Sequence, residues 1–596
     1  MTGPTIRAIA LTVAGLCLTA DNPRTQQVRD AVRAAVGGSG QITGGVLTPG
    51  ASPVPVRRAR VTLNSDDRRV GFTTATDDQG RFRFTALPAG RFALQATKPG
   101  HLPAPYGAVR PGRAGTSVGL GEGQQIDDLV IRMARGSVIA GVVRDHRGEP
   151  MPGANVLVLR YAFAPLTGER TLLRANSSTA DDRGMYRIFE LPPGQYVVLA
   201  RPTGIGLDEI VPITSDAVQR LLQLAGGGPG ATAAAGAARP IPGADRPVSY
   251  APVFHPGSPD LSRAETITLG LADERLDVDL ALELVRTARI TVRFTAPDGI
   301  APESVSIEIV RSGPDGELLG QLGTVSPFVR LGREWTYTLP GVPPGRFTIE
   351  ASTDRYLRNP KLRRVWGEAD VIVDGRDQEI AIALQHGVTV SGRVLFDGTS
   401  PLPDMANLEF FLTQGAGGAL NAGGPGGELD AEGRFSFPDV TPGRYALTWV
   451  RRGPATAWAI ATATAAGRDV LDTRLDVRPG QPIDLVVTFT DRPTQLGGRL
   501  QDVSGRAAPD YFIIVFTTDR SFWTPASRRV RMIRPATDGA FATVGLPPGE
   551  YFIGALLDVE RGEWYDPRFL EALAKASVKV ALRAGETTTQ DLRVGR

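Results

Sequence analysis

The stretch from His146 to Glu149 is the place in this sequence that most resembles a metal-binding motif. An H-x-x-E spacing can begin a zinc site, but such a site needs a third protein ligand and a fixed second layer of hydrogen bonds. The next histidine, His255, stands in the unrelated phrase "VFHPGSPD". His146 also falls within a D-x-x-G-x-P stretch that is typical of a turn. We therefore interpret His146 as a turn residue and predict no metal ligand.

The other residues suited to catalysis are scattered or lie in turns. His101, His255 and His386 have no second histidine at a ligand spacing, and we expect them in loops or between domains. No nucleophile elbow and no Ser-x-x-Lys pattern is present. The pairs Asp77-Asp78 and Asp181-Asp182 suit acid–base pairs or calcium ligands, but adjacent residues point apart and their hairpin positions favour turn capping. The sequence predicts no catalytic residue, no cofactor and a protein that is not an enzyme.

Aromatic residues near the C-terminus are the candidates for ligand binding. Trp523 in "RSFWTP", and Trp564 and Tyr565 in "GEWYDP", could form flat faces for a saccharide. Asp566 followed by Pro567 is a typical helix start, so packing of Trp564 against a short helix is the alternative. Saccharide binding by Trp523, Trp564 and Tyr565 is therefore one of two interpretations.

The elements around these residues are predicted by a phrase that occurs five times. The copies are LPAGRF at 87–92, LPPGQY at 191–196, VPPGRF at 342–347, VTPGRY at 440–445 and LPPGEY at 546–551. Proline presets φ, glycine tolerates unusual φ, and the aromatic residue starts a strand, so each copy predicts a turn between two strands. Five copies predict five modules.

Short alternating runs around each copy indicate strands. Apolar residues two apart, such as Phe82 and Phe84 or Tyr186 and Ile188, mark one buried strand face. Buried runs such as "FIIVF" favour sandwich cores. We predict an all-β protein, a tandem array of about five prealbumin-like or Ig-like β-sandwich modules. The expected ranges are 1–20 signal peptide, 21–39 spacer, 40–134 module 1, 136–285 module 2 with a flexible insertion at 205–247, 286–385 a diverged module 3, 387–490 module 4 and 492–596 module 5.

The combined order of motifs resembles the carboxypeptidase regulatory-like domain family. The best copy runs from Val138 through "VVRDHRGEPMPGANVLVL" and "TADDRGMYRIFELPPGQYVVLA" to Ala200. The resemblance implies a transthyretin-like (prealbumin-like) sandwich, also classed with carbohydrate-binding-like folds, and arrays of this kind occur in exported bacterial proteins. Its motif residues are turn and core residues, so it implies a fold and no catalytic residue.

Composition and the N-terminus bear on location and partners. The net charge is +3, from 66 basic and 63 acidic residues of 596, with no polybasic run, so nucleic acid is not expected as a partner. Arg7 precedes a small apolar stretch from Ala8 to Leu18, which predicts a signal peptide and export to the periplasm, the outer surface or the medium. No later segment suits a transmembrane span. The only cysteine, Cys17, lies in the signal segment, with lipidation as the alternative to removal.

These observations favour an exported, non-catalytic scaffold that binds a carbohydrate or an envelope protein through its loops. Two alternatives stay open: a carbohydrate-binding protein that uses exposed aromatic residues, and a regulatory or accessory partner of a separate peptidase.

Overall fold

The structure is a computed structural model of the 596-residue chain. It describes residues 38–65, 71–163, 170–202, 247–297, 300, 305–312, 329–330, 335–353, 364–414, 426–451, 457–525 and 527–595. The predicted signal peptide, nearly all of the spacer and nearly all of the insertion at 205–247 lie outside these residues.

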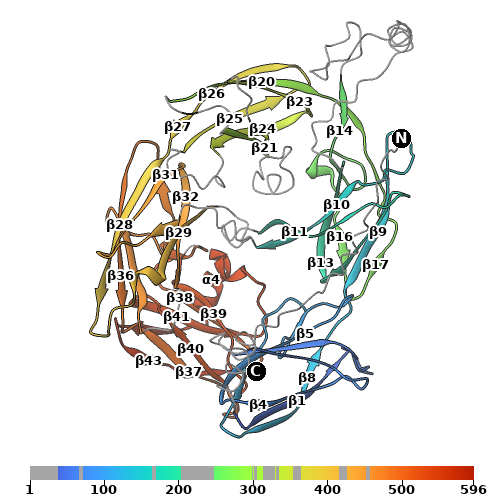
Figure 1. Cartoon of the computed structure of the whole chain (residues 1–596). Helices are drawn as coiled ribbons and strands as arrows, with labels where there is room; N and C mark the ends of the chain where they lie inside the picture. Colours follow the sequence, from blue (N-terminus) through green and yellow to red (C-terminus); the bar gives the residue numbers. More distant parts are fainter. Residues whose placement is uncertain are drawn as a thin grey trace, which may run out of the picture.

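The described residues form five β-sandwich modules, so the predicted fold class is confirmed (Figure 1). Module 1 contains β1 (Gly40–Leu47), β2 (Arg60–Ser65), β3 (Gly71–Ala75), β4 (Arg81–Leu87), β5 (Gly90–Thr97), β6 (Ala104–Pro105), β7 (Val118–Leu120) and β8 (Gln125–Arg132). Module 2 contains β9 (Ser137–Arg144), β10 (Asn155–Phe163), β11 (Arg170–Thr179), β12 (Met185–Leu191), β13 (Gly194–Arg201), β14 (Val248–Tyr250), β15 (Val253–Phe254), β16 (Ile267–Leu269), β17 (Glu274–Arg275), β18 (Leu280–Ala281) and β19 (Leu284–Arg286).

The remaining modules follow along the chain. Module 3 contains β20 (Ala288–Thr295), β21 (Val305–Ser312), β22 (Val329–Arg330), β23 (Thr336–Val342), β24 (Gly345–Thr353), β25 (Val365–Val373), β26 (Gln378–Ala383) and β27 (Gln385–His386). Module 4 contains β28 (Val388–Asp397), β29 (Leu408–Gln414), β30 (Gly426–Glu428), β31 (Arg434–Val440), β32 (Gly443–Arg451), β33 (Ala459–Ala465), β34 (Arg468–Asp469), β35 (Leu475–Val477) and β36 (Ile483–Thr490). Module 5 contains β37 (Gln495–Asp502), β38 (Phe512–Thr517), β39 (Val530–Ile533), β40 (Ala540–Val544), β41 (Gly549–Leu556), helix α4 (Pro567–Ala574), β42 (Val578–Leu582), β43 (Thr587–Thr589) and β44 (Leu592–Val594).

All five modules share the pairing of their central strands. The first strand pairs antiparallel with the strand that precedes the repeated phrase, as β1 does with β4 and β28 with β31. It also pairs parallel with a strand near the end of its module, as β1 does with β8, β20 with β26 and β28 with β36. The strand after the phrase belongs to the opposite sheet, where β5 pairs with β2 and β32 with β29. Each phrase therefore carries the chain from one sheet of the sandwich to the other.

The residue before each phrase has a left-handed backbone. Ala86, Glu190, Gly341, Asp439 and Gly545 have φ between 52° and 81°. In the first four modules the pairing of the two strands shifts register close to this residue. In three modules the tyrosine that ends the phrase also closes the turn, because its hydroxyl donates to the carbonyl four residues earlier. These bonds join Tyr196 to Pro192, Tyr445 to Thr441 at 2.8 Å and Tyr551 to Pro547 at 2.6 Å.

Each sandwich has its own core, and two modules add a second one. Alternating strand residues fill five separate clusters, one between the sheets of each module. In module 2, Leu157 and Leu199 face outward and are covered by the segment around Leu261. In module 5, Ile514 and Phe516 face outward and are covered by α4. These two sheets are therefore apolar on both faces, which explains the continuous runs "NVLVL" and "FIIVF".

The five modules are arranged around a ring (Figure 1). Module 5, drawn in red, returns beside module 1, drawn in blue. Hydrogen bonds join the two modules, including Thr537 N–H to the Ser117 carbonyl at 3.0 Å. The closing contact therefore joins parts of the chain that lie more than 400 residues apart in sequence.

Candidate functional sites

Aspartates of the hairpin turns use their carboxylates on the backbone. Asp77, Asp181 and Asp430 each accept hydrogen bonds from the N–H groups two and four residues later. The first aspartate of each Asp-Asp pair is thus the capping residue, and the turn interpretation is confirmed.

Asp145 and Asp502 cap turns in the same way. Each lies in the hairpin after the first strand of its module, Asp145 in module 2 and Asp502 in module 5. The Asp502 carboxylate accepts bonds from Ser504 and Arg506. The hydrogen bond from the Ser504 side chain lowers the pKa of Asp502 to about 2. An ionised, hydrogen-bonded carboxylate of this kind is suited to holding a turn and not to accepting a proton near neutral pH.

His146 lies in the first of these turns. Asp145 Oδ1 accepts the N–H groups of Arg147 and Glu149, and Gly148 has φ of 81°. The His146 Nδ1 atom lies 2.8 Å from the Tyr250 hydroxyl. The prediction that His146 is a turn residue is confirmed, with a tyrosine as its side-chain partner.

The other histidines bond to backbone carbonyls. His101 Nδ1 lies 3.3 Å from the Pro99 carbonyl, His255 Nδ1 lies 3.0 Å from the Asp279 carbonyl, and His386 Nδ1 lies 3.3 Å from the Arg364 carbonyl. No group of three or more His, Cys, Asp or Glu side chains among the described residues could hold a metal ion.

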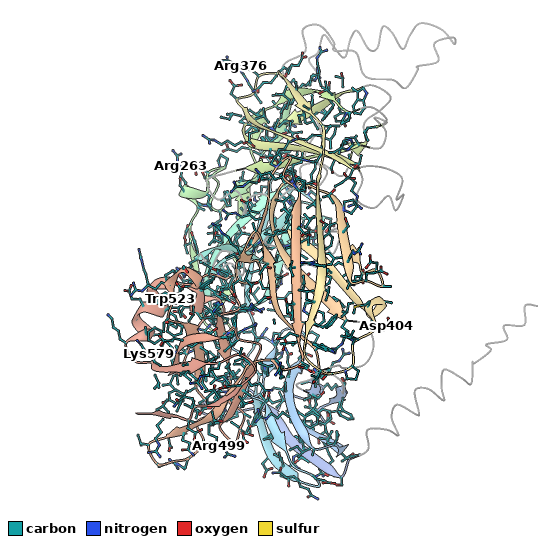
Figure 2. All side chains as sticks on the ribbon, turned by 90° about the vertical axis from the view of Figure 1, so that its left-hand side faces the viewer. Arg263, Arg376, Asp404, Arg499, Trp523 and Lys579 are labelled. Atoms are coloured by element: carbon teal, nitrogen blue, oxygen red, sulfur yellow. The ribbon has the colours of Figure 1, made fainter. Side chains whose placement is uncertain are left out.

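The three aromatic candidates lie close together in module 5, but they are not equally accessible. Trp523 is only 5% exposed, and its indole N–H donates to the Thr517 carbonyl at 2.8 Å. Its ring packs edge-on against Phe516 with centroids 5.7 Å apart. Figure 2 places Trp523 within module 5, where it belongs to the outer core beneath α4. Trp523 therefore packs as a core residue and offers no open ring face.

Trp564 and Tyr565 are half-buried at the start of the helix. Their ring centroids lie 5.8 Å apart with planes inclined by 56°. Asp566 caps α4 by accepting the Arg568 N–H at 2.9 Å, and Pro567 is the first helical residue, so the predicted helix is confirmed. Both rings also contact the cluster that contains Leu570. They pack against the helix and keep part of their surface in solvent.

A buried ion network between modules 4 and 5 has no counterpart in the sequence motifs. The Asp472 side chain is 0% exposed and lies 3.3 Å from Arg528 Nε and 2.9 Å from Arg529 Nε. Arg528 also bonds to Asp469 at 2.6 Å and to the Ala461 carbonyl at 2.6 Å. The adjacent pair Arg528-Arg529 was the only available signal, and arginine is too common here for such a pair to indicate a contact.

Two further acidic residues connect neighbouring modules. Glu190 Oε1 of module 2 accepts the Gly100 N–H of module 1 at 2.8 Å. Asp439 Oδ2 of module 4 accepts the N–H of Arg364, the residue before β25 of module 3, at 3.0 Å. Both stand at the left-handed position before the repeated phrase, so this position forms the turn and also holds the preceding module.

Within the described residues, no helix is long and apolar enough to span a membrane. The polar groups described above are used in turns, in caps and between modules. These groups therefore hold the loops and the contacts between modules.

Comparisons with known proteins agree with the architecture. The carboxypeptidase regulatory-like domain matches residues 41–125 and 138–224. No curated protein sequence matches the chain.

Several solved structures of bacterial proteins align with the chain at low identity. The minor pilin of Streptococcus agalactiae is 14% identical, with 42% of this chain and 98% of that chain covered and a TM-score of 0.21. A putative carbohydrate binding protein from Pseudomonas aeruginosa is 15% identical, with 17% and 95% covered and a TM-score of 0.11. The full-length RrgB pilus protein of Streptococcus pneumoniae is 7% identical, with 94% and 99% covered and a TM-score of 0.15.

The matched residues lie within modules 1 and 2, and the other three modules repeat the pairing of their central strands. The chain therefore contains two carboxypeptidase regulatory-like domains, at residues 41–125 and 138–224.

Proposed function

We propose that this protein is exported and acts as a non-catalytic scaffold that presents loops to a carbohydrate or to a protein of the cell envelope. One observation supports the proposal: the polar clusters found in the described modules hold turns, caps and module contacts. A protein that uses its charged groups in this way is suited to positioning surfaces and not to proton or group transfer.

Export is the part of the proposal that can be tested first. Residues 1–39 would be fused to a phosphatase reporter that is active only outside the cytoplasm, beside the same fusion without residues 8–18. Activity of the first fusion alone is expected, because the apolar stretch is the predicted export signal. If the full chain fractionates with the cytoplasm, an envelope scaffold is excluded.

A carbohydrate is the second candidate ligand, and the partly exposed pair Trp564 and Tyr565 favours it. Neighbouring aromatic rings with open surface suit contact with sugar rings. The test is a glycan array probed with the full chain and with a Trp564→Ala, Tyr565→Ala variant. Trp523 is left intact, because its removal would open a cavity in the outer core of module 5.

The matched control is Phe189→Ala, since Phe189 is an exposed aromatic residue of module 2. Binding that is lost in the double variant and kept in the control would support the carbohydrate candidate. Binding that survives in both variants would remove Trp564 and Tyr565 from the site. An array without signal would favour a protein partner.

A further inference from the structure

The hydrogen-bonded contact that closes the ring joins one loop of module 1 to one end of module 5, and beside it Gly562 of module 5 lies against Phe163 of module 2. We name it the closing interface, and it consists of residues 106–117 of module 1 with residues 509, 534, 537, 558 and 560 of module 5. Arg534 Nη2 donates to the Gly107 carbonyl at 2.8 Å and to Thr116 Oγ1 at 2.7 Å. Thr116 Oγ1 in turn donates to the Pro509 carbonyl at 3.3 Å.

Module 5 holds Arg534 ready for this contact. Its guanidinium lies over the Phe512 ring, 4.3 Å from the centroid, and its Nη1 atom donates to the Asp510 carbonyl at 3.0 Å. The side chain is thus fixed by its own module before it reaches module 1, which lowers the entropy lost on docking.

Ion pairs extend the interface on one side. Arg113 Nε lies 2.5 Å from Asp558 Oδ1, and Arg110 Nη1 lies 3.3 Å from Asp558 Oδ2. Arg113 Nη2 also lies 3.8 Å from Glu560. The Arg113 side chain is 13% exposed and that of Asp558 is 28% exposed, so solvent reaches the pair.

The closing interface differs from the sandwich interiors because no hydrophobic cluster of the described residues crosses it. The cluster of module 1 contains only module 1 residues, and those of module 5 contain only module 5 residues. Ion pairs that solvent reaches contribute little to stability. The tether between the modules supplies a high effective concentration, so a weak interface can still be occupied.

We propose that the closing interface is a latch: when its polar contacts are broken, module 5 also separates from Phe163 of module 2, and the ring opens into a row of five folded modules. Each module keeps its own core in the open row, since none of the five cores is shared. Opening exposes the module 1 loop and the acidic edge of module 5, which are covered in the ring.

Charge reversal and charge swap of the central ion pair test the latch. Asp558→Arg places a third cation beside Arg110 and Arg113, and the double variant Arg113→Asp, Asp558→Arg restores opposite charges. Small-angle scattering of the full chain would give the maximum dimension. The maximum dimension of five equal domains rises by up to about 1.9-fold when a pentagon becomes a straight row, and this ratio is the upper limit for Asp558→Arg. The swap variant should return towards the wild-type dimension.

Arg376→Asp is the matched control, since Arg376 is an exposed arginine of module 3 outside the closing interface. Its maximum dimension should equal that of the wild type. Calorimetric unfolding of each variant shows whether the modules stay folded. An unchanged dimension in Asp558→Arg, or a wild-type chain that is already a row, would overturn the latch.

A cross-linked chain keeps the test independent of the folding of Asp558→Arg. Ser117 and Thr537 are joined by a backbone hydrogen bond, so cysteines at these positions, with Cys17→Ser, suit a short thiol cross-linker. We expect an intramolecular cross-link in monomers and a closed dimension even after Asp558→Arg is added. Cross-links only between chains, or none, would contradict the latch.

Discussion

A close backbone contact recurs where modules begin. Gly38, Gly136 and Gly387 precede the first strands of modules 1, 2 and 4, and each lies against the left-handed turn before the repeated phrase. A Cβ atom built on Gly136 would lie 2.4 Å from Glu190 Cα, and one on Gly387 would lie 2.3 Å from the Asp439 carbonyl carbon. Modules 3 and 5 have Thr287 and Thr494 at the first position and a glycine in the turn. Two positions meet in each module, one before the first strand and one before the repeated phrase. In every module one of the two is a glycine.

Gly136→Ala is expected to destabilise module 2 by about 1 to 3 kcal/mol, because the backbone of Glu190 must move to admit the methyl group. Gly119→Ala is the control, since a Cβ atom there meets nothing within 4 Å. Denaturant unfolding of the full chain should show a loss for Gly136→Ala only. Equal effects of the two substitutions would contradict the close-contact explanation.

The phrase tyrosines allow a hydroxyl group to be removed without changing the ring. Tyr551 is fully buried, and burial raises its pKa to about 12, so the hydroxyl stays protonated and donates to Pro547. Modules 1 and 3 have Phe92 and Phe347 at this position, which shows that the ring alone fits.

Tyr551→Phe should therefore lower the free energy of unfolding of module 5 by about 1 kcal/mol through the lost hydrogen bond. Calorimetry of the full chain can measure this shift. If the stability of module 5 does not change, the tyrosine hydroxyl contributes nothing to the turn.

At the scale of elements, local patterns were sufficient for much of the fold. The alternation at Phe82 and Phe84, and the cap and proline at Asp566 and Pro567, correctly predicted a strand and a helix. The outer core of module 5 was not predicted, because a run of buried residues does not reveal what covers its second face. For that reason Trp523 looked as accessible as Trp564 in the sequence. The left-handed residues before the phrases were also missed, since Ala86, Glu190 and Asp439 are not glycines.

The N-terminal cap of α4 should stabilise the helix that covers the outer core of module 5. Asp566→Ala removes the acceptor of the Arg568 N–H and should destabilise α4 by about 1 kcal/mol. Asp566→Asn is the control, because asparagine caps nearly as well. The tryptophan emission of the full chain should shift to longer wavelength at lower denaturant concentration for the alanine variant alone. Identical transitions for both variants would rule out a capping role.

At the scale of the whole molecule, contacts between modules could not be predicted from the sequence. Asp472 with Arg529, and Asp558 with Arg113, join separate modules, and no periodic pattern marks such pairs. The repeat predicted the modules because each is a local unit. The path of the array depends on single side chains at the module ends.

The buried network between modules 4 and 5 should couple their unfolding. Asp472→Ala leaves Arg528 and Arg529 without their shared carboxylate, and we expect a loss of about 3 kcal/mol. Asp476→Ala is the control, since its pair with Arg478 is largely exposed and contributes little. Calorimetry should show the transitions of the two modules separating only in Asp472→Ala. A single unchanged transition would mean that the network does not couple the modules.

The closing interface should depend on pH through Asp558. The hydrogen bond from Arg113, with the charges of Arg113 and Arg110, lowers the pKa of Asp558 although partial burial opposes the shift. A carboxylate whose pKa is lowered in the closed ring stabilises that ring above its ordinary pKa of about 3.9. This contribution is lost as the pH falls through the lowered pKa, so acid should favour the open row.

Scattering of the full chain from pH 7 down to about pH 2 measures this effect, because the titration lies below the ordinary carboxylate range. The maximum dimension should rise on acidification in the wild type. Asp558→Asn should be open already at pH 7 and change less. The Ser117→Cys, Thr537→Cys cross-linked chain should stay closed throughout, which separates opening of the latch from acid unfolding of the modules. A wild-type ring that keeps its dimension at pH 2 would contradict a role of the ionised Asp558 in closure.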